Sequence, residues 1–137
     1  MKIKTANLTD AALNWAISIA RGSTEYIDLS KTYVGSDGTK YICTEGGFTI
    51  NYLSWAQGGP IIDRENISIG RNLSNDEVSP GIFHLNLTDW KAESDYSVLL
   101  MRWSHTGHGP TPLIAAMRCY VASKLGDEVE IPEELCK

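Results

Sequence analysis

The sequence has little of what marks membrane, secreted or metal-binding proteins. None of its 137 residues lies in an apolar run of 18 or more, so no membrane-spanning helix is predicted. The three cysteines, Cys43, Cys119 and Cys136, form an odd set without a CxxC pair, which argues against a disulfide framework and a zinc knuckle. The first residues lack the apolar core of a signal peptide. We therefore expect a cytoplasmic protein that holds no metal or cofactor.

Basic residues are also few. Lys and Arg number 12 against 17 Asp and Glu, which gives a net charge of −5, and they are scattered singly along the chain. Nucleic acids and anionic membrane surfaces are bound mainly by clustered positive charge. The composition therefore predicts neither a nucleic-acid partner nor a membrane partner.

The remaining composition is ordinary for a globular domain, with 42% apolar and 21% charged residues. A chain of this length fits one domain, here residues 1–137. We expect an α+β fold in which two main helices pack on a small mixed or antiparallel sheet of short strands with long loops.

The first helix is expected over residues 10–21. The hydroxyl of Thr9 is suited to accept a hydrogen bond from an unpaired amide at the helix start. Leu8 and Leu13 have the spacing of a hydrophobic staple, and Gly22 is placed to end the helix.

The second helix is expected over residues 112–125. Thr111 is placed to cap it, Pro112 occupies a first-turn position that needs no N–H, and Gly126 ends it. The acidic segment from Asp127 onward is expected to lie extended and solvated on the surface.

The middle of the chain is predicted to be rich in β-structure. Apolar and β-branched residues between turn signals indicate short strands at residues 25–29, 40–44, 66–70 and 95–103. Within the last of these, the unbroken apolar run Val98–Met101 favours a strand that is covered on both faces, and the alternative is a short helix.

Three segments together resemble a known family. They are Leu8–Ala16, Trp55–Arg64 and Gly109–Leu135, and the longest of them carries most of the likeness. The combination resembles the NinX-like proteins, a family of unknown function encoded by tailed bacteriophages and prophages. The resemblance implies an accessory phage protein in the host bacterial cytoplasm, and it implies no catalytic residues.

The segment from residue 105 to residue 111 is the first candidate site. His105, Thr106, His108 and Thr111 bring imidazoles and hydroxyls to the start of a helix, and Arg102 is near in sequence. Helix N-termini attract anions because free N–H groups and the helix dipole converge there. The alternatives are a plain capped turn and a metal site built on the two histidines, for which no third ligand is evident.

The glycine-rich segment from residue 55 to residue 64 is the second candidate site. In a loop, Gly58 and Gly59 would let the backbone approach a neighbouring segment or a ligand closely. Trp55 could stack on a planar ring, Gln57 could bind the edge of that ring, and Arg64 could pair with an anion. The alternative is a structural turn that carries a buried tryptophan. Neither segment matches a Walker A or dinucleotide-binding pattern.

These features favour a non-catalytic binder of a small anionic, nucleotide-like ligand that counteracts host defence signalling. A second hypothesis is a protein-interaction module that binds a host or phage enzyme through exposed aromatic residues and the acidic tail. A third is an enzyme acting on nucleotides, with His105 or His108 as acid or base. The four tryptophans also favour a homo-oligomer, because aromatic residues are enriched at interfaces.

Overall fold

The computed structural model describes residues 1–23, 27–36, 38, 40–71, 74–80, 82–86 and 89–136. Its helices are the 3₁₀-helix η1 (Thr5–Asn7), α1 (Asp10–Ala20), α2 (Trp55–Arg64), α3 (Pro112–Leu125) and the 3₁₀-helix η3 (Glu133–Leu135). Its strands are β1 (Lys2–Lys4), β2 (Ile27–Val34), β3 (Lys40–Thr44), β4 (Thr49–Ile50), β5 (Ser68–Arg71), β6 (Ser74–Ser79), β7 (Ile82–Asn86), β8 (Trp90–Ser97), β9 (Arg102–Gly109) and β10 (Glu128–Glu130). The predicted α+β class is confirmed.

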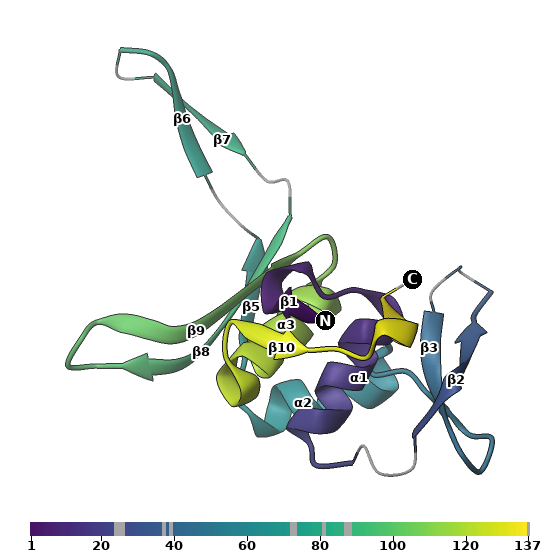
Figure 1. Cartoon of the computed structure of the whole chain (residues 1–137). Helices are drawn as coiled ribbons and strands as arrows, with labels where there is room; N and C mark the ends of the chain where they lie inside the picture. The colour runs from purple at the N-terminus through teal and green to yellow at the C-terminus, as the bar shows by residue number, and fades with distance from the viewer. Residues whose placement is uncertain are drawn as a thin grey trace.

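The strands described here form four separate antiparallel groups (Figure 1). The sheet β5-β8-β9 is covered by α3, and the sheet β2-β3-β4 lies beside α1. β1 pairs with β10, and β6 pairs with β7 in a hairpin that stands away from the helices (Figure 1). The β8–β9 hairpin also extends beyond the body, on a different side of it.

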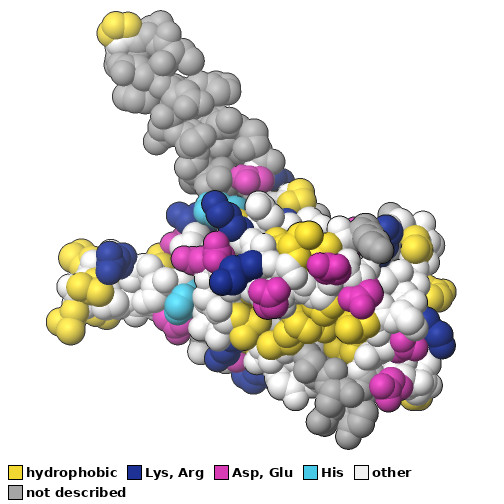
Figure 2. All heavy atoms as spheres, in the orientation of Figure 1, with side chains coloured by type: hydrophobic (Ala, Val, Ile, Leu, Met, Phe, Trp, Pro, Cys, Tyr) yellow, Lys and Arg dark blue, Asp and Glu magenta, His cyan; other side chains and the backbone are white. Residues whose placement is uncertain are grey.

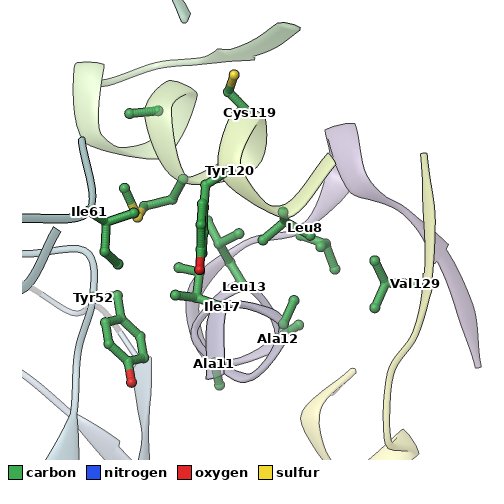
Figure 3. Close-up of a cluster of buried hydrophobic side chains, with 14 of the residues drawn as sticks. Leu8, Ala11, Ala12, Leu13, Ile17, Tyr52, Ile61, Cys119, Tyr120 and Val129 are labelled. Carbon is green, nitrogen blue, oxygen red and sulfur yellow. The ribbon is translucent and has the colours of Figure 1, made fainter. Parts of the chain in front are cut away.

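The core lies between α1 and α3. Leu13 and Ile17 of α1 are fully buried, and Figure 3 shows them facing Tyr120 of α3. Met117 and Val121 of α3 are also fully buried in this cluster. Burying one large aliphatic side chain contributes roughly 1.5–3 kcal/mol, so the contact between these two helices is a main source of stability.

The helix ends mostly agree with prediction. α3 spans residues 112–125, the Thr111 hydroxyl accepts the Ile114 N–H at 3.2 Å, and Gly126 follows with a positive φ of 89°. α1 ends at Ala20 and is followed by Gly22, whose φ is 75°. The prediction for the Thr9 side chain is wrong, because its hydroxyl accepts no capping hydrogen bond.

The segment after Gly126 was expected to lie extended on the surface, and that expectation is wrong for its apolar residues. Val129, Ile131 and Leu135 are buried in the core cluster, and β10 pairs with β1 from Lys2↔Glu130 to Lys4↔Glu128. The acidic side chains of the segment alternate with these apolar residues and are exposed. The alternation is that of a half-buried strand.

The strand predictions have mixed outcomes. The strand at 40–44 is confirmed, and the strand predicted at 66–70 overlaps β5. The strand predicted at 25–29 overlaps β2 from Ile27, while residues 25 and 26 lie outside the described part of the chain.

The single strand predicted at 95–103 is wrong. The chain reverses at residues 98–101, and Ser97 pairs with Arg102 across the resulting hairpin. The apolar run is therefore the turn of the hairpin and is covered on neither face. Periodicity failed here because an unbroken apolar run normally reports burial within the same chain.

Candidate functional site

The glycine-rich segment 55–64 is the helix α2, so the prediction of a loop there is wrong. The helix starts after Ser54, whose carbonyl accepts the backbone N–H groups of Gln57 and Gly58. Two glycines and Pro60 are poor helix formers, so tertiary packing must stabilise this helix.

Gly58 is the point at which α2 meets the rest of the molecule. A Cβ on Gly58 would lie 2.6 Å from the Tyr52 carbonyl oxygen and 2.8 Å from Leu113 Cδ2. A Cβ on the neighbouring Gly59 would meet nothing within 4 Å. Gly58 therefore permits close packing of α2, whereas no contact in the structure requires a glycine at position 59.

The second predicted loop, from residue 105 to residue 111, is mostly strand. Its residues 105–109 are the last five residues of β9, so the loop prediction is wrong for this part. A Cβ on Gly107 would overlap the Ala115 carbonyl oxygen and the Cys119 backbone nitrogen. A Cβ on Gly109 would lie 2.7 Å from Ile114 Cγ2. These glycines bring the sheet against α3.

Two of the predicted site residues lie together. Trp55 and Thr111 line one pocket of about 300 Å³ at the N-terminus of α3, between Leu53 and Ile114. Trp55 is 59% exposed there, so the alternative reading of a buried tryptophan does not hold. Gly59 lines a shallower hollow next to Trp55.

Thr106 and His108 line a different pocket. It has a volume of about 620 Å³ and lies between the segment Lys4–Ala6, the end of β9 and Arg118 of α3. The two predicted segments therefore do not form one site: Thr111 shares a pocket with Trp55, and Thr106 and His108 face Arg118.

The remaining predicted residues are dispersed. Gln57 is exposed on α2, and Arg64 Nε lies 3.4 Å from Glu65 Oε1. His105 Nε2 lies 3.3 Å from Asp95 Oδ2. Arg102 is exposed at the start of β9, six residues before His108, which is roughly 20 Å along an extended strand.

Arg118 is a residue that sequence reasoning missed. Its Nε donates to the Leu8 carbonyl oxygen at 2.9 Å, and its Nη1 donates to the His108 carbonyl oxygen at 2.8 Å. Burial lowers the pKa of its guanidinium from the ordinary value. One signal was available: Arg118 is the sole charged residue between Pro112 and Ser123. A charge inside an otherwise apolar helix needs partners.

The second missed feature is the apolar tip, which we define as residues Val98–Met101 at the end of the β8–β9 hairpin. Their exposed fractions are 80%, 96%, 62% and 79%. Behind the tip, Tyr96 and Trp103 stack edge to face with ring centroids 5.1 Å apart. Figure 2 shows these apolar side chains gathered at the end of an arm that projects from the body.

The structure gives little support to cysteine chemistry at Cys119. The thiol is buried, and its sulfur lies 3.5 Å from the Ser94 hydroxyl. Burial raises the pKa of this thiol, so its reactive thiolate form is disfavoured. Among the residues that the structure describes, no three His, Cys, Asp or Glu side chains gather as a metal site would require.

Comparison with known families decides the wider assignment. Residues 4–124 match the family model described as Bacteriophage P22, NinX. The chain belongs to the NinX family. The resemblance inferred from three segments is thus confirmed, and NinX membership makes the chain a bacteriophage accessory protein. Both pockets and the apolar tip lie largely within the matched NinX region.

A search of curated proteins finds no match. No described helix is long and apolar enough to cross a membrane.

Proposed function

We propose that the chain is a protein-interaction module that binds a host or phage protein through the apolar tip. The exposure of four consecutive large apolar side chains at Val98–Met101 is the observation that carries this proposal. Hairpin turns are normally built from Gly, Asn, Asp and similar residues. The fold therefore gains nothing from aliphatic side chains here, and their burial against a partner supplies the favourable free energy.

Contacts within the hairpin fix the conformation of the apolar tip before any partner binds. The Leu100 N–H donates to the Ser97 hydroxyl at 3.2 Å inside the turn, and the Tyr96–Trp103 pair stiffens the hairpin behind it. A contact element that is ordered before binding loses less conformational entropy on association.

The charge of the tip defines the partner surface. Arg102 is the sole charged residue from Tyr96 to Trp103, although the chain as a whole carries a net charge of −5. A matching surface is an apolar groove with a carboxylate at its rim, which would pair with the guanidinium. This differs from the contact surface of exposed aromatics and acidic tail that the sequence suggested.

A variant pair tests the proposal. Leu99→Ser and Leu100→Ser together remove two of the four side chains of the apolar tip. Phe48→Ser removes a comparably exposed apolar side chain elsewhere, 76% exposed on the segment before β4. Each protein is used to capture partners from phage-infected bacteria, and any partner is then purified and titrated against all variants. We expect the tip variant to bind at least about tenfold more weakly, as loss of a central apolar anchor does, and the Phe48 variant to bind like the parent.

Three results would overturn the proposal. Equal binding by both variants would place the contact elsewhere. A concentration-dependent dimer that only the tip variant loses would make a second copy of the chain the occupant. Sedimentation with neutral lipid vesicles that only the tip variant loses would make the occupant a membrane.

A further inference from the structure

The pocket around Arg118 has the make-up of a binding site. Its floor is α3, one wall is the segment from Lys4 to Ala6, and the opposite wall is the end of β9. Its volume of about 620 Å³ is in the usual range for small-molecule sites, roughly 300–1,000 Å³. Its described lining is Lys4, Thr5, Ala6, Thr106, Gly107, His108, Arg118, Ala122, Asp127 and Glu128.

Arg118 is positioned by the backbone but its charge is not matched. A guanidinium has five N–H donors, and two of these bind the carbonyl oxygens of Leu8 and His108. Within the described part of the chain, no carboxylate oxygen lies within 4.0 Å of it. The two carbonyl contacts account for its orientation, and a neutral donor could make them. They do not offset the free-energy cost of half-burying a positive charge.

The other charged and polar groups that line the pocket differ in sign. Lys4 and His108 are exposed on the two walls, so positive or protonatable groups face the pocket from both sides. Asp127 and Glu128 line the end next to Lys4, and Glu128 is opposite Lys4 in the β1–β10 register. The acidic pair therefore lies beside Lys4, and the pocket carries charges of both signs.

We propose that this pocket binds a small molecule with one oxyanion group, a phosphate or a carboxylate, held by the fork of Arg118 N–H groups. Lys4 and His108 contribute charge or hydrogen bonds to the same group. The acidic pair favours a ligand that also carries a hydrogen-bond donor or a positive charge, and it disfavours a molecule with a second anionic group. This site is independent of the apolar tip and of the interaction proposed for it.

The proposal is tested by nuclear magnetic resonance titration with inorganic phosphate and, separately, with acetate. The two arms distinguish phosphate from carboxylate recognition. We expect saturable shifts of the backbone amides of Thr106, Gly107 and His108 and of the Arg118 Nε–H.

Two lysines on β1 provide a matched comparison. Lys4 lines the pocket and is opposite Glu128, whereas Lys2 lies outside the lining and is opposite Glu130. Lys4→Gln is expected to weaken binding about two- to fivefold, the usual size of one exposed charge contact, and Lys2→Gln is expected to change it little. Arg118→Lys keeps the charge but loses the fork, so it is expected to weaken binding more than Lys4→Gln does.

The expected pattern separates a site from general attraction to positive charge. Absence of saturable shifts with both anions at tens of millimolar would overturn the proposal. Equal weakening by Lys4→Gln and Lys2→Gln would also overturn it, because a local site distinguishes the two positions. Both lysines are exposed on the same short strand, so this comparison stands even if an Arg118 variant fails to fold.

Discussion

Asn14 and Tyr52 tie the first helix to the segment that precedes α2. The buried Oδ1 of Asn14 accepts the backbone N–H of Tyr52 at 2.6 Å, across 38 positions of sequence. The Nδ2 of the same side chain donates to the Asp10 carbonyl oxygen at 3.2 Å. Asn14 is fully buried on α1, and both ends of its amide are satisfied in the core.

The first prediction concerns this contact. Asn14→Ala leaves the buried Tyr52 N–H without an acceptor, so we expect the free energy of unfolding to fall by about 1–3 kcal/mol. Urea denaturation followed by circular dichroism measures this change. Asn7→Ala, at an exposed position, is the control and should stay within about 0.5 kcal/mol of the parent. Equal losses in the two variants would contradict the role given to Asn14.

The second prediction uses the two adjacent glycines of α2. Gly58→Ala places a methyl group against the Tyr52 carbonyl and the Leu113 side chain, and overpacking of this kind costs about 1–3 kcal/mol. Gly59→Ala meets open space and should stabilise the helix by roughly 0.5–1 kcal/mol. Thermal denaturation of both proteins gives the comparison. Opposite signs are expected, and destabilisation by both changes would argue against the helix.

The third prediction tests how closely β9 approaches α3. Gly107→Ala forces its methyl group into the backbone of residues 115 and 119, so we expect a loss of about 3 kcal/mol or failure to fold. Gly70→Ala, on β5 of the same sheet, meets nothing within 4 Å and should be nearly neutral. Chemical denaturation separates the two outcomes, and a neutral Gly107→Ala would show that the helix and strand lie further apart.

The fourth prediction concerns the end of α3. Gly126 has φ 89° and ψ −167°, a conformation that side chains with a Cβ rarely adopt. A Cβ there would touch nothing within 4 Å, so the cost of Gly126→Ala is conformational, about 1–3 kcal/mol. Gly126→Val should cost at least as much, because branching at Cβ adds restriction. The control is Gly46→Ala, whose glycine has no positive φ, and an equal shift in its denaturation midpoint would contradict this reading.

The fifth prediction concerns thiol reactivity. Cys119 is fully buried and its pKa is raised by burial, whereas Cys136 is partly exposed. Because burial blocks access to the Cys119 sulfur and also raises the pKa of its thiol, iodoacetamide should alkylate it at least about tenfold more slowly than Cys136. Mass spectrometry of the labelled peptides measures both rates. Rapid labelling of Cys119 in the folded protein would contradict this prediction and would support a nucleophilic role for Cys119.

The ends of α3 were predictable because they depend on local chemistry. Thr111 caps an amide three residues away, Pro112 needs no N–H, and Gly126 supplies a backbone conformation available to few other residues. The strand at 40–44 could likewise be predicted from the residues that form it. Such features are decided within a few positions of sequence.

The errors arose where distant residues decide the outcome. Gly58 suggests a loop until its contact with Leu113 is known, and Gly107 suggests a loop until α3 is placed against it. The apolar tip was mispredicted for another reason, because its residues have the composition of a core segment yet are mostly exposed. The candidate site was anticipated at Thr106 and His108, but Arg118 joins them only through the packing of α3 on β9.

The pairing of β1 with β10 has a consequence for synthesis. Lys4 and its partner Glu128 are 124 positions apart (128 − 4). At ribosomal speeds of roughly 5–20 residues per second, β1 is therefore synthesised about 6–25 s before β10. The interval between the synthesis of α1 and that of α3, which it contacts, is nearly as long. The face of α1 that packs on α3 is therefore without its partner until residues 112–125 have been made, which makes the chain a candidate client of ribosome-associated chaperones.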